Sequence, residues 1–214
     1  MNGTGVAAGY VTTAVPLAAG VTALCLACQA TTADVVWPGQ GRFTLRRCRR
    51  CRLTFTVPHL TSDEMRSFYD ARYYGTTGRF SEITEWIVGW FRRRRAEVLC
   101  RLLPPGSVLD IGCGSGHMLQ ALRQRGWRVT GSELSERAAR HARLLGLDVE
   151  VGAYSPDHWM PGSFDAVILW HALEHLPDPR AILRGLARLV RPGGIVAIAV
   201  PSFSNPTVID AARD

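Results

Sequence analysis

A glycine-rich turn and a glutamate further along the chain have the residue types and spacing of a cofactor site. Residues 108–116 read Val-Leu-Asp-Ile-Gly-Cys-Gly-Ser-Gly, which predicts a short buried strand that runs directly into a turn. Gly112, Gly114 and Gly116 allow the backbone to turn sharply and to approach a ligand closely, because they have no Cβ. Glu133 follows seventeen residues after Gly116, at the end of a second strand-like run, where it can accept hydrogen bonds from ribose hydroxyls. The pattern predicts a site for a nucleoside-containing cofactor.

The glycine spacing and the acidic residue before it narrow the class of cofactor. Dinucleotide folds have the pattern Gly-x-Gly-x-x-Gly, and the position of the third glycine is His117 in this chain. Asp110 lies inside the expected strand, where a carboxylate would repel a pyrophosphate but would suit a cofactor with an ammonium group. A nicotinamide-binding Rossmann domain is therefore the less favoured alternative.

These residues resemble motif I of the class I S-adenosylmethionine-dependent methyltransferases, and the resemblance covers about residues 99–202. Residues 163–170 resemble the fourth strand of that family, residues 171–179 the segment after it, and residues 191–201 the turn and fifth strand. The resemblance implies S-adenosylmethionine as the cofactor. The residues it assigns to cofactor binding are Asp110, Gly112, Cys113, Gly114, Gly116, Glu133, Leu134 and Trp170.

The same region alternates between strand-like and helix-like segments. Strands are expected at residues 107–111, 128–132, 148–151, 164–170 and 195–200, and helices at 118–125, 136–145 and 179–190. Strands separated by helices imply right-handed crossovers, so the expected fold class is α/β with a Rossmann-like, doubly wound parallel sheet. Because the family's sheet has seven strands and the chain ends at Asp214, the sheet is expected to be truncated after the fifth strand. That strand would be an uncovered edge through which the chain could self-associate.

Two histidines after the expected fourth strand are the candidates for a catalytic base. The methyl group of the cofactor is already activated, so the protein mainly aligns the acceptor with it and excludes water. A base is needed only if the acceptor loses a proton, and we assign that role to His171, with His175 as the second candidate. A helix-capping or packing role is the alternative for both. The segment also fits the His-x-x-Glu-His pattern of inverzincin proteases, but it follows a buried strand and Pro177 limits any helix, so a protease is not favoured.

The segment after the third strand departs from the family pattern. Relatives often place an aspartate two residues after a glycine there, to hold the adenine amino group. Here Gly152 is followed by Ala153 and Tyr154, so Ser155, Asp157 or the backbone is expected to take that role.

Four of the six cysteines form a metal-binding pattern near the N-terminus. Cys25 and Cys28 make one Cys-x-x-Cys pair, and Cys48 and Cys51 make a second one after nineteen intervening residues. This spacing can bring four thiolates onto one tetrahedral Zn²⁺, as in a zinc ribbon, with short strands near residues 35–37 and 42–45. Because the protein fills all four positions, the zinc is expected to be structural. Redox-active or incidental thiols are the alternative.

Six arginines surround the second cysteine pair: Arg42, Arg46, Arg47, Arg49, Arg50 and Arg52. These arginines have two interpretations: they could bind nucleic acid, or they could compensate the negative charge of a tetrathiolate zinc centre. We favour charge compensation, because only Trp37, Phe43 and Phe55 are available to stack on bases. The formal net charge of +7 is carried entirely by arginine, with no lysine, which indicates compositional bias rather than binding to polyanions.

The sequence divides into four parts. Residues 1–23 carry no charged side chain and are expected to be a flexible tail, because Pro16 interrupts their apolar run and the basic start of a secretory signal is missing. Residues 24–58 form the zinc-ribbon-like module, and residues 102–214 form the C-terminally incomplete methyltransferase core. No membrane association is expected, and reduced thiols together with a metabolite cofactor point to the cytoplasm.

A helical linker, residues 59–101, joins the two parts. It begins with a capping box at residues 61–64, in which Thr61 is the N-cap. Tyr73 and Tyr74 are candidates for a lid over the cofactor, and packing between the two domains is an equal alternative.

The sequence thus predicts an S-adenosylmethionine-dependent methyltransferase that acts on a small-molecule or sugar-type acceptor. One alternative is an RNA methyltransferase that recognises its substrate through the arginine-rich ribbon. A second is an inactive, truncated fragment that binds the cofactor only. The identity of the acceptor and of the methylated atom is not determined by these residues.

Overall fold

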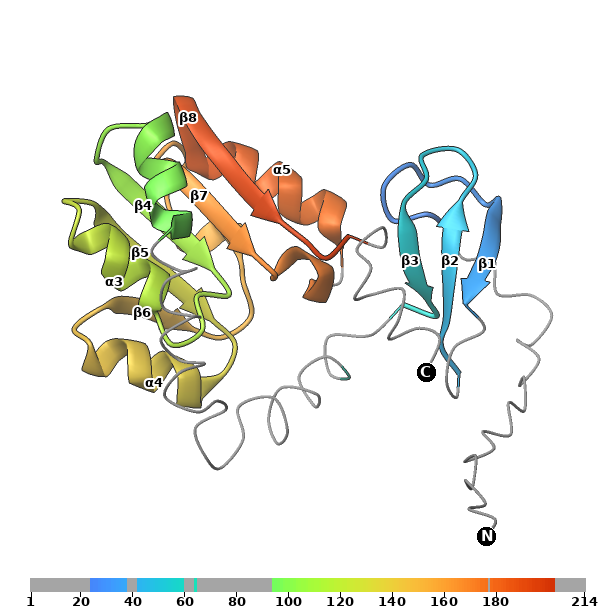
Figure 1. Cartoon of the computed structure of the whole chain (residues 1–214), viewed down its shortest axis with the longest axis horizontal. Coiled ribbons are helices and arrows are strands. Elements are labelled where there is room, and N and C mark those ends of the chain that lie inside the picture. The colour runs from blue at the N-terminus through green and yellow to red at the C-terminus, as the bar shows by residue number, and fades with distance from the viewer. Residues whose placement is uncertain (1–23, 38–41, 60–63, 65–93, 177, 203–214) are drawn as a thin grey trace, which may run out of the picture. The chain divides into compact units, whose positions relative to one another are not determined.

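The computed structural model describes residues 24–37, 42–59, 64, 94–176 and 178–202 (Figure 1). The chain divides into two compact units, Met1–His59 and Leu60–Asp214. The expected tail, residues 61–63 of the capping box and the lid candidates Tyr73 and Tyr74 lie outside the described residues.

The first unit is a three-stranded antiparallel sheet. Its strands β1 (Ala33–Trp37), β2 (Thr44–Cys48) and β3 (Thr54–Val57) pair in the order β1-β2-β3. Phe55 and Val57 alternate onto the buried face, where they pack with Cys25 and Cys48. β1 contains the strand expected from the sequence, and β2 begins two residues later than expected. The sequence did not predict β3, because four residues are too few to display an alternating pattern.

The second unit contains a five-stranded sheet in which every pairing is parallel (Figure 1). In chain order the strands are β4 (Ser107–Ile111), β5 (Arg128–Glu133), β6 (Asp148–Val151), β7 (Phe164–Trp170) and β8 (Val190–Ala199). Their order in the sheet is β6-β5-β4-β7-β8. From β4 the chain first adds β5 and β6 on one side and then β7 and β8 on the other, so the strand order reverses between β4 and β7. This is the doubly wound arrangement expected from the sequence, and ligands bind such sheets at the carboxyl ends of the strands near the reversal.

Helices connect the strands. They are α3 (His117–Arg123), α4 (Glu136–Leu144) and α5 (Pro179–Leu189), with short 3₁₀ turns η2 (Pro156–His158) and η3 (Leu173–His175). Residues 94–102 are also helical. α4 begins with the Ser135 side chain accepting the Ala138 N–H, and α5 begins with Asp178 accepting two N–H groups. The helices end one or two residues earlier than the sequence predicted, which is the usual uncertainty of helix ends.

β8 differs most from its expected bounds. The sequence predicts a strand at residues 195–200, whereas β8 begins at Val190 and includes the turn that contains Gly193 and Gly194. The register of β8 against β7 shifts between Phe164 and Ala166, because Phe164 pairs with Val190 but Ala166 pairs with Ile195, so β8 has more residues than β7 between these two pairs. After that irregularity the regular pairing continues from Ile195 to Ala199.

The central strands β4 and β7 are buried on both faces of the sheet. On one face, Val108, Ala166 and Ile168 pack with Ala96 and Leu99 of the helical residues 94–102 and with Leu122 and Trp127. On the other face, Leu109, Ile111, Val167 and Leu169 pack with Leu186 and Leu189 of α5. Because successive side chains of a strand alternate between faces, Asp110 lies on the same face as Val108. That is the face covered by residues 94–102.

Asp165 joins the amino ends of three strands. Its carboxylate accepts hydrogen bonds from the Ser107 N–H at 2.6 Å and the Ser107 hydroxyl at 2.7 Å, and it pairs with Arg191. The hydrogen bond from the Ser107 backbone is the main reason that the pKa of Asp165 falls to about 2. Ser107 begins β4, Asp165 lies in β7 and Arg191 lies at the start of β8, so this cluster fixes the three strands relative to one another.

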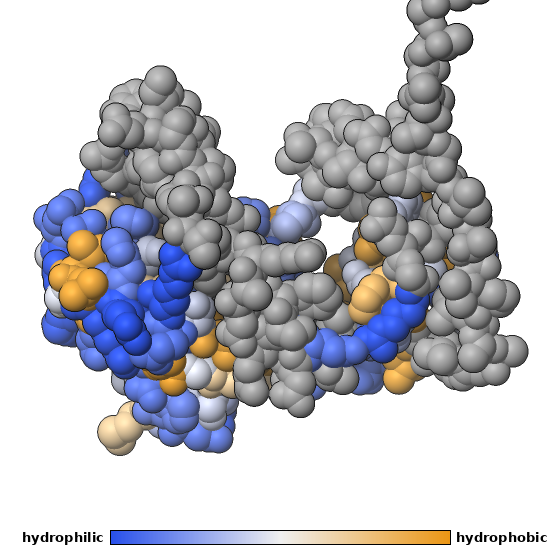
Figure 2. Space-filling model, turned by 90° about the horizontal axis from the view of Figure 1, so that it is seen from below, coloured by the Kyte–Doolittle hydropathy of each residue, from blue (hydrophilic) through white to orange (hydrophobic). Residues whose placement is uncertain are grey.

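β8 lies at an edge of the sheet in the described part of the chain and exposes Val196 and Ile198, and Val200, directly after the strand, is also exposed. On the face shown in Figure 2, hydrophilic side chains cover most of the described surface and hydrophobic ones occur in small groups. Within the described ranges, we find no helix with the length and apolar character needed to cross a membrane.

Candidate functional site

The turn after β4 has the backbone that the glycines predicted. Gly112, Gly114 and Gly116 all have left-handed φ values, of 73°, 55° and 77°. The N–H groups of Gly112 and Cys113 both donate to the carbonyl of Ser132 in β5, at 2.7 and 3.1 Å. A Cβ on Gly116 would lie 2.4 Å from a methyl group of Leu147, so this turn requires glycine for both conformation and space.

Glu133, the last residue of β5, anchors the turn. The residue is only 5% exposed. One carboxylate oxygen accepts the Gly114 N–H at 2.8 Å, and the other accepts the Ser135 N–H at 2.8 Å. The carboxylate is therefore held in one orientation beside the glycine turn. Leu134, the neighbouring cofactor candidate, lies between Glu133 and the N-cap of α4.

Asp110 is a second buried carboxylate near the turn, 3% exposed. Burial is the main cause that raises its pKa to about 7, the charge of Glu133 adds to the increase, and the Arg95 guanidinium opposes it. Two buried carboxylates in one region make a positively charged ligand favourable and a pyrophosphate unfavourable.

Arg95 lies beside two of the candidate site residues, Trp170 and Asp110, a position that the sequence did not reveal. The run of four arginines at residues 92–95 predicts a solvated helix face, but the Arg95 guanidinium lies 4.4 Å from the centroid of the Trp170 ring. Trp170 ends β7 and is packed against the core cluster on the same face as Asp110. The buried indole N–H of Trp170 has no hydrogen-bond partner among the described residues. Only the packing of residues 94–102 on this face brings Arg95 to the site.

Cys113, also assigned to cofactor binding, packs within the protein. Its sulfur packs closely against Gly131 of β5, where an added Cβ would lie only 2.7 Å from it. Cys113 also packs with Leu119 and Val149 in the core. Burial raises the pKa of the Cys113 thiol, so the group is neutral.

The two candidate histidines share one carboxylate at the carboxyl end of β7. Glu174 Oε1 lies 3.5 Å from Nδ1 of His171 and 3.8 Å from Nε2 of His175. Burial lowers the pKa of His175. His171 has a left-handed φ of 53°, and its N–H donates to the Ala199 carbonyl of β8 at 2.9 Å. The segment forms a single 3₁₀ turn, η3, rather than the α-helix on which an inverzincin pattern would present its ligands.

The segment proposed to replace the adenine-binding aspartate is occupied by local interactions. The Ser155 hydroxyl accepts the Asp157 N–H at 3.4 Å, and the Asp157 carboxylate lies 3.6 Å from the Arg188 guanidinium. Tyr154 stacks on Trp159, with ring centroids 6.1 Å apart.

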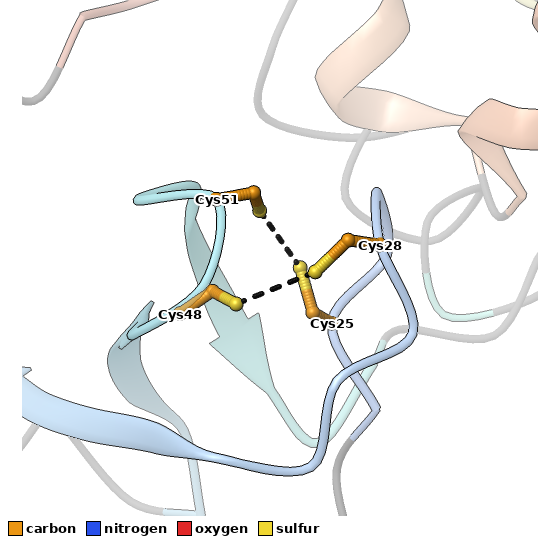
Figure 3. A group of neighbouring side chains, drawn as sticks. All are labelled: Cys25, Cys28, Cys48 and Cys51. Atoms are coloured by element: carbon orange, nitrogen blue, oxygen red, sulfur yellow. Dashed lines mark hydrogen bonds between the residues drawn. The ribbon is translucent and has the colours of Figure 1, made fainter.

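The four cysteines of the first unit come together, as Figure 3 shows. Their Sγ atoms all lie within 4.8 Å of one another. Hydrogen bonds from the backbone N–H groups of Cys51 and then Arg50 lower the pKa of Cys48 to about 6, against the effect of burial. The spacing of the four sulfur atoms is compatible with their expected role as ligands of one metal ion.

Some of the arginines around this cluster have partners within the unit. Arg49 donates to the Asp34 carboxylate at 2.5 and 2.9 Å, and the Arg42 guanidinium lies 4.8 Å from the Phe43 ring centroid. Phe55, one of the three aromatic residues considered for base stacking, is buried in the core of the unit. The contacts of Arg42, Arg49 and Phe55 are therefore internal to the unit and do not favour a role for these three residues in nucleic-acid binding.

The fold and the site together define a class of protein. A doubly wound parallel sheet, an acidic strand residue before a turn of left-handed glycines, and a second acid at the end of the next strand are the core of a class I S-adenosylmethionine-dependent methyltransferase. The chain belongs to the methyltransferase-domain family, whose model matches residues 88–213. The recognition made from the sequence is therefore confirmed.

Individual relatives agree with this assignment. A ubiquinone biosynthesis O-methyltransferase from Pseudomonas aeruginosa is 41% identical over 99 residues, which are 43% of this chain and 43% of that protein. A protein of the same name from Xanthomonas campestris is 39% identical over 104 residues, which are 45% of this chain and 44% of that protein. The chain thus matches less than half the length of these curated relatives. A crystal structure from Pyrococcus horikoshii has the same fold, with a TM-score of 0.51 and 22% identity over 60% of this chain and 65% of that one.

Proposed function

We propose that this protein binds S-adenosylmethionine at the glycine turn and transfers its methyl group to a small-molecule or sugar-type acceptor. The observation that carries the proposal is the pair of buried carboxylates beside the turn, Asp110 and Glu133. S-adenosylmethionine supplies a methyl group on a positively charged sulfur and also carries an ammonium group, so it suits a site with this charge. The names of the matched relatives support a small molecule with a hydroxyl group as the acceptor.

Glu133 would orient the ribose. Its carboxylate is held beside the glycine turn by the N–H groups of Gly114 and Ser135, and from there it would accept hydrogen bonds from the ribose hydroxyls. Because those two backbone bonds already fix the carboxylate, little side-chain entropy is lost when a ribose binds. Asp110 would act by its charge, which becomes fully developed when a cation lies nearby and lowers its pKa.

His171 would accept the proton of a hydroxyl acceptor. Its Nδ1 faces Glu174, so Nε2 is the nitrogen left to take the proton as the methyl group is transferred. The Glu174 carboxylate would stabilise the imidazolium that results. A left-handed φ at a residue with a Cβ is energetically unfavourable, and residues held in this way concentrate at functional sites.

The first test is calorimetric titration of S-adenosylhomocysteine, the product of the cofactor, into the purified chain, with NADH titrated in parallel. Micromolar binding of the nucleoside and no binding of NADH is the expected result. A folded protein that binds NADH instead would show that the site belongs to a dinucleotide fold. A folded protein that binds neither would show that this chain is not a working methyltransferase.

The second test concerns the base. Once an acceptor is found by its mass gain of one methyl group, His171→Gln should lower kcat by about 100-fold or more and leave the affinity for S-adenosylhomocysteine unchanged. His158→Gln is the matched control, because His158 is half exposed and lies beside the Glu150 carboxylate, whereas His171 and His175 lie beside Glu174. Equal kcat in the wild type and the His171 variant would rule out this residue as the base.

A steep salt dependence of RNA binding, with RNA methylation, would favour the RNA alternative instead.

A further inference from the structure

The two cysteine pairs of the first unit lie in turns that have the same backbone. In each turn the N–H of the first cysteine donates to the carbonyl five residues later, at 2.9 Å for Cys25 and 2.8 Å for Cys48. In each turn the residue after the second cysteine donates its N–H back to the carbonyl of the first, at 2.9 Å from Gln29 and 3.0 Å from Arg52. The chain therefore forms the same cysteine-presenting turn twice.

Each turn places a residue with a side chain in the left-handed conformation. Gln29 has φ 59° and Arg52 has φ 65°, at equivalent positions directly after the second cysteine of each pair. Among the residues that the structure describes, only His171 shares this property outside glycine. The conformation is unfavourable for any residue with a Cβ. Its occurrence at both equivalent positions indicates that another interaction keeps the turns in this shape.

The four sulfur atoms have the spacing of a metal centre. Cys25 Sγ lies 3.5 Å from Cys51 Sγ, and Cys28 Sγ lies 3.5 Å from Cys48 Sγ, so both short contacts join one turn to the other (Figure 3). Four Zn–S bonds of about 2.3 Å in a tetrahedron give S···S distances of about 3.8 Å. A disulfide needs about 2.05 Å between its sulfur atoms, so the cysteines are not paired in this arrangement.

The unit has few other buried side chains. Its fully buried cluster in the described residues consists of Cys25, Cys48, Phe55 and Val57, so two of its four members are cysteines. A core of this size is too small to stabilise a separate unit, and small domains of this kind usually need a metal or disulfides. A metal ion bound by the cysteine cluster would supply the folding free energy that this small core does not.

We propose that Cys25, Cys28, Cys48 and Cys51 bind one structural Zn²⁺ through their Sγ atoms. Binding converts four thiols to thiolates and releases four protons, which leaves a centre with two negative charges. All four tetrahedral positions are filled by the protein, so no position remains for a water or a substrate. The role of the ion is to hold the two turns together and to fold residues 24–58 around them. This inference does not depend on the methyl-transfer activity.

The metal content of the full chain tests the proposal. Protein purified without added metal should contain about one zinc per chain by elemental analysis, and a thiol-blocking mercurial should release it. Cys48→Ser should lose most of the bound zinc, whereas Cys100→Ala, the matched control, should retain it. Cys100 lies in the second unit, packed beside the core of the sheet. Replacement by Co²⁺ should produce the visible bands of a tetrahedral tetrathiolate site.

A second measurement keeps the test valid if the Cys48 variant fails to fold. Removal of zinc from the wild-type chain by a chelator should increase hydrogen exchange in peptides from β1, β2 and β3, and added zinc should reverse the change. The affinity for S-adenosylhomocysteine, measured on the same samples, reports separately on the second unit. Purified protein that contains iron, disulfides between these cysteines, or reduced thiols without metal would overturn the proposal. So would an exchange pattern that is the same with and without zinc.

Discussion

Replacement of Glu133 by alanine tests the cofactor site directly, because this carboxylate has two separable roles. In the protein as it stands, its oxygens accept the N–H groups of Gly114 and Ser135, both at 2.8 Å. In the proposed complex, the same oxygens would also accept the two ribose hydroxyls. The first role contributes to stability and the second to affinity, so Glu133→Ala should change both.

The magnitudes follow from these contacts. A hydrogen bond to a charged group contributes about 1.5–3 kcal/mol, so loss of two ribose bonds should cost about 3–6 kcal/mol of binding free energy. That is a loss of about 100-fold or more in affinity for S-adenosylhomocysteine. The two backbone N–H groups left without an acceptor should lower the free energy of unfolding by about 1–3 kcal/mol each. Glu133→Gln should be intermediate, because an amide has one oxygen to replace two.

Calorimetric titration measures the affinity, and urea denaturation measures the stability and shows that the variant is folded. Glu136→Ala is the matched control, since Glu136 is an exposed glutamate three residues later in the first turn of α4. It should bind with the affinity of the wild type. The assignment would be refuted by a folded Glu133→Ala protein that binds S-adenosylhomocysteine within about threefold of the wild type.

Three further predictions concern a tight turn and two carboxylates. Gly116→Ala should lower the free energy of unfolding by about 2–4 kcal/mol in urea denaturation, because the added Cβ would lie 2.4 Å from a Leu147 methyl group and 2.8 Å from the Ala142 Cβ. Gly193→Ala has a similar φ but nothing within 4 Å, and should lose only about 1 kcal/mol; equal losses would contradict the steric argument. The Asp165 pKa of about 2 lies below its ordinary value, so the ionised carboxylate stabilises the protein at neutral pH, and this stabilisation is lost as the pH falls from about 4 to about 2. Asp165→Asn should lower the free energy of unfolding by about 1–2 kcal/mol at pH 6, and the variant should lose less stability than the wild type when the pH is lowered to 3, as measured by thermal unfolding. A variant that loses as much stability at pH 3 as the wild type would argue against the assignment. Because Asp110 has a pKa of about 7 and a cation favours its ionised form, affinity for S-adenosylhomocysteine should fall, by at most about tenfold per pH unit, below pH 7. Calorimetry should show this fall in the wild type but not in Asp110→Asn, and equal pH dependence would refute it.

Much of the fold could be predicted because its signals are local. The bounds of β4, β6 and β7 agree with the sequence prediction, since each is an apolar or alternating run bordered by turn-forming residues. The glycine turn was also predictable, because the left-handed backbone at Gly112, Gly114 and Gly116 needs residues without a Cβ. β3 and the early start of β8 were missed, because one is too short for a pattern and the other runs through a glycine turn.

The residues that the sequence determined by itself are those whose role depends on their own type and on near neighbours. Glycines in the turn, an acid at the end of a strand and cysteines three residues apart carry their chemistry in their spacing. The order of strands and helices follows from the same kind of local pattern. From these alone the class of fold, the cofactor and the methyltransferase family could be named.

The tertiary structure decided which distant groups act on one another. The packing of residues 94–102 on one face of the sheet places Arg95 over Trp170 and near Asp110, although local sequence predicts a solvated arginine. Strand pairing likewise brings Asp165 to Ser107, 58 positions away. The ionisation of Asp110 depends on burial and on the charges around it. No local pattern encodes such properties, because they arise from contacts between segments that only the folded chain brings together.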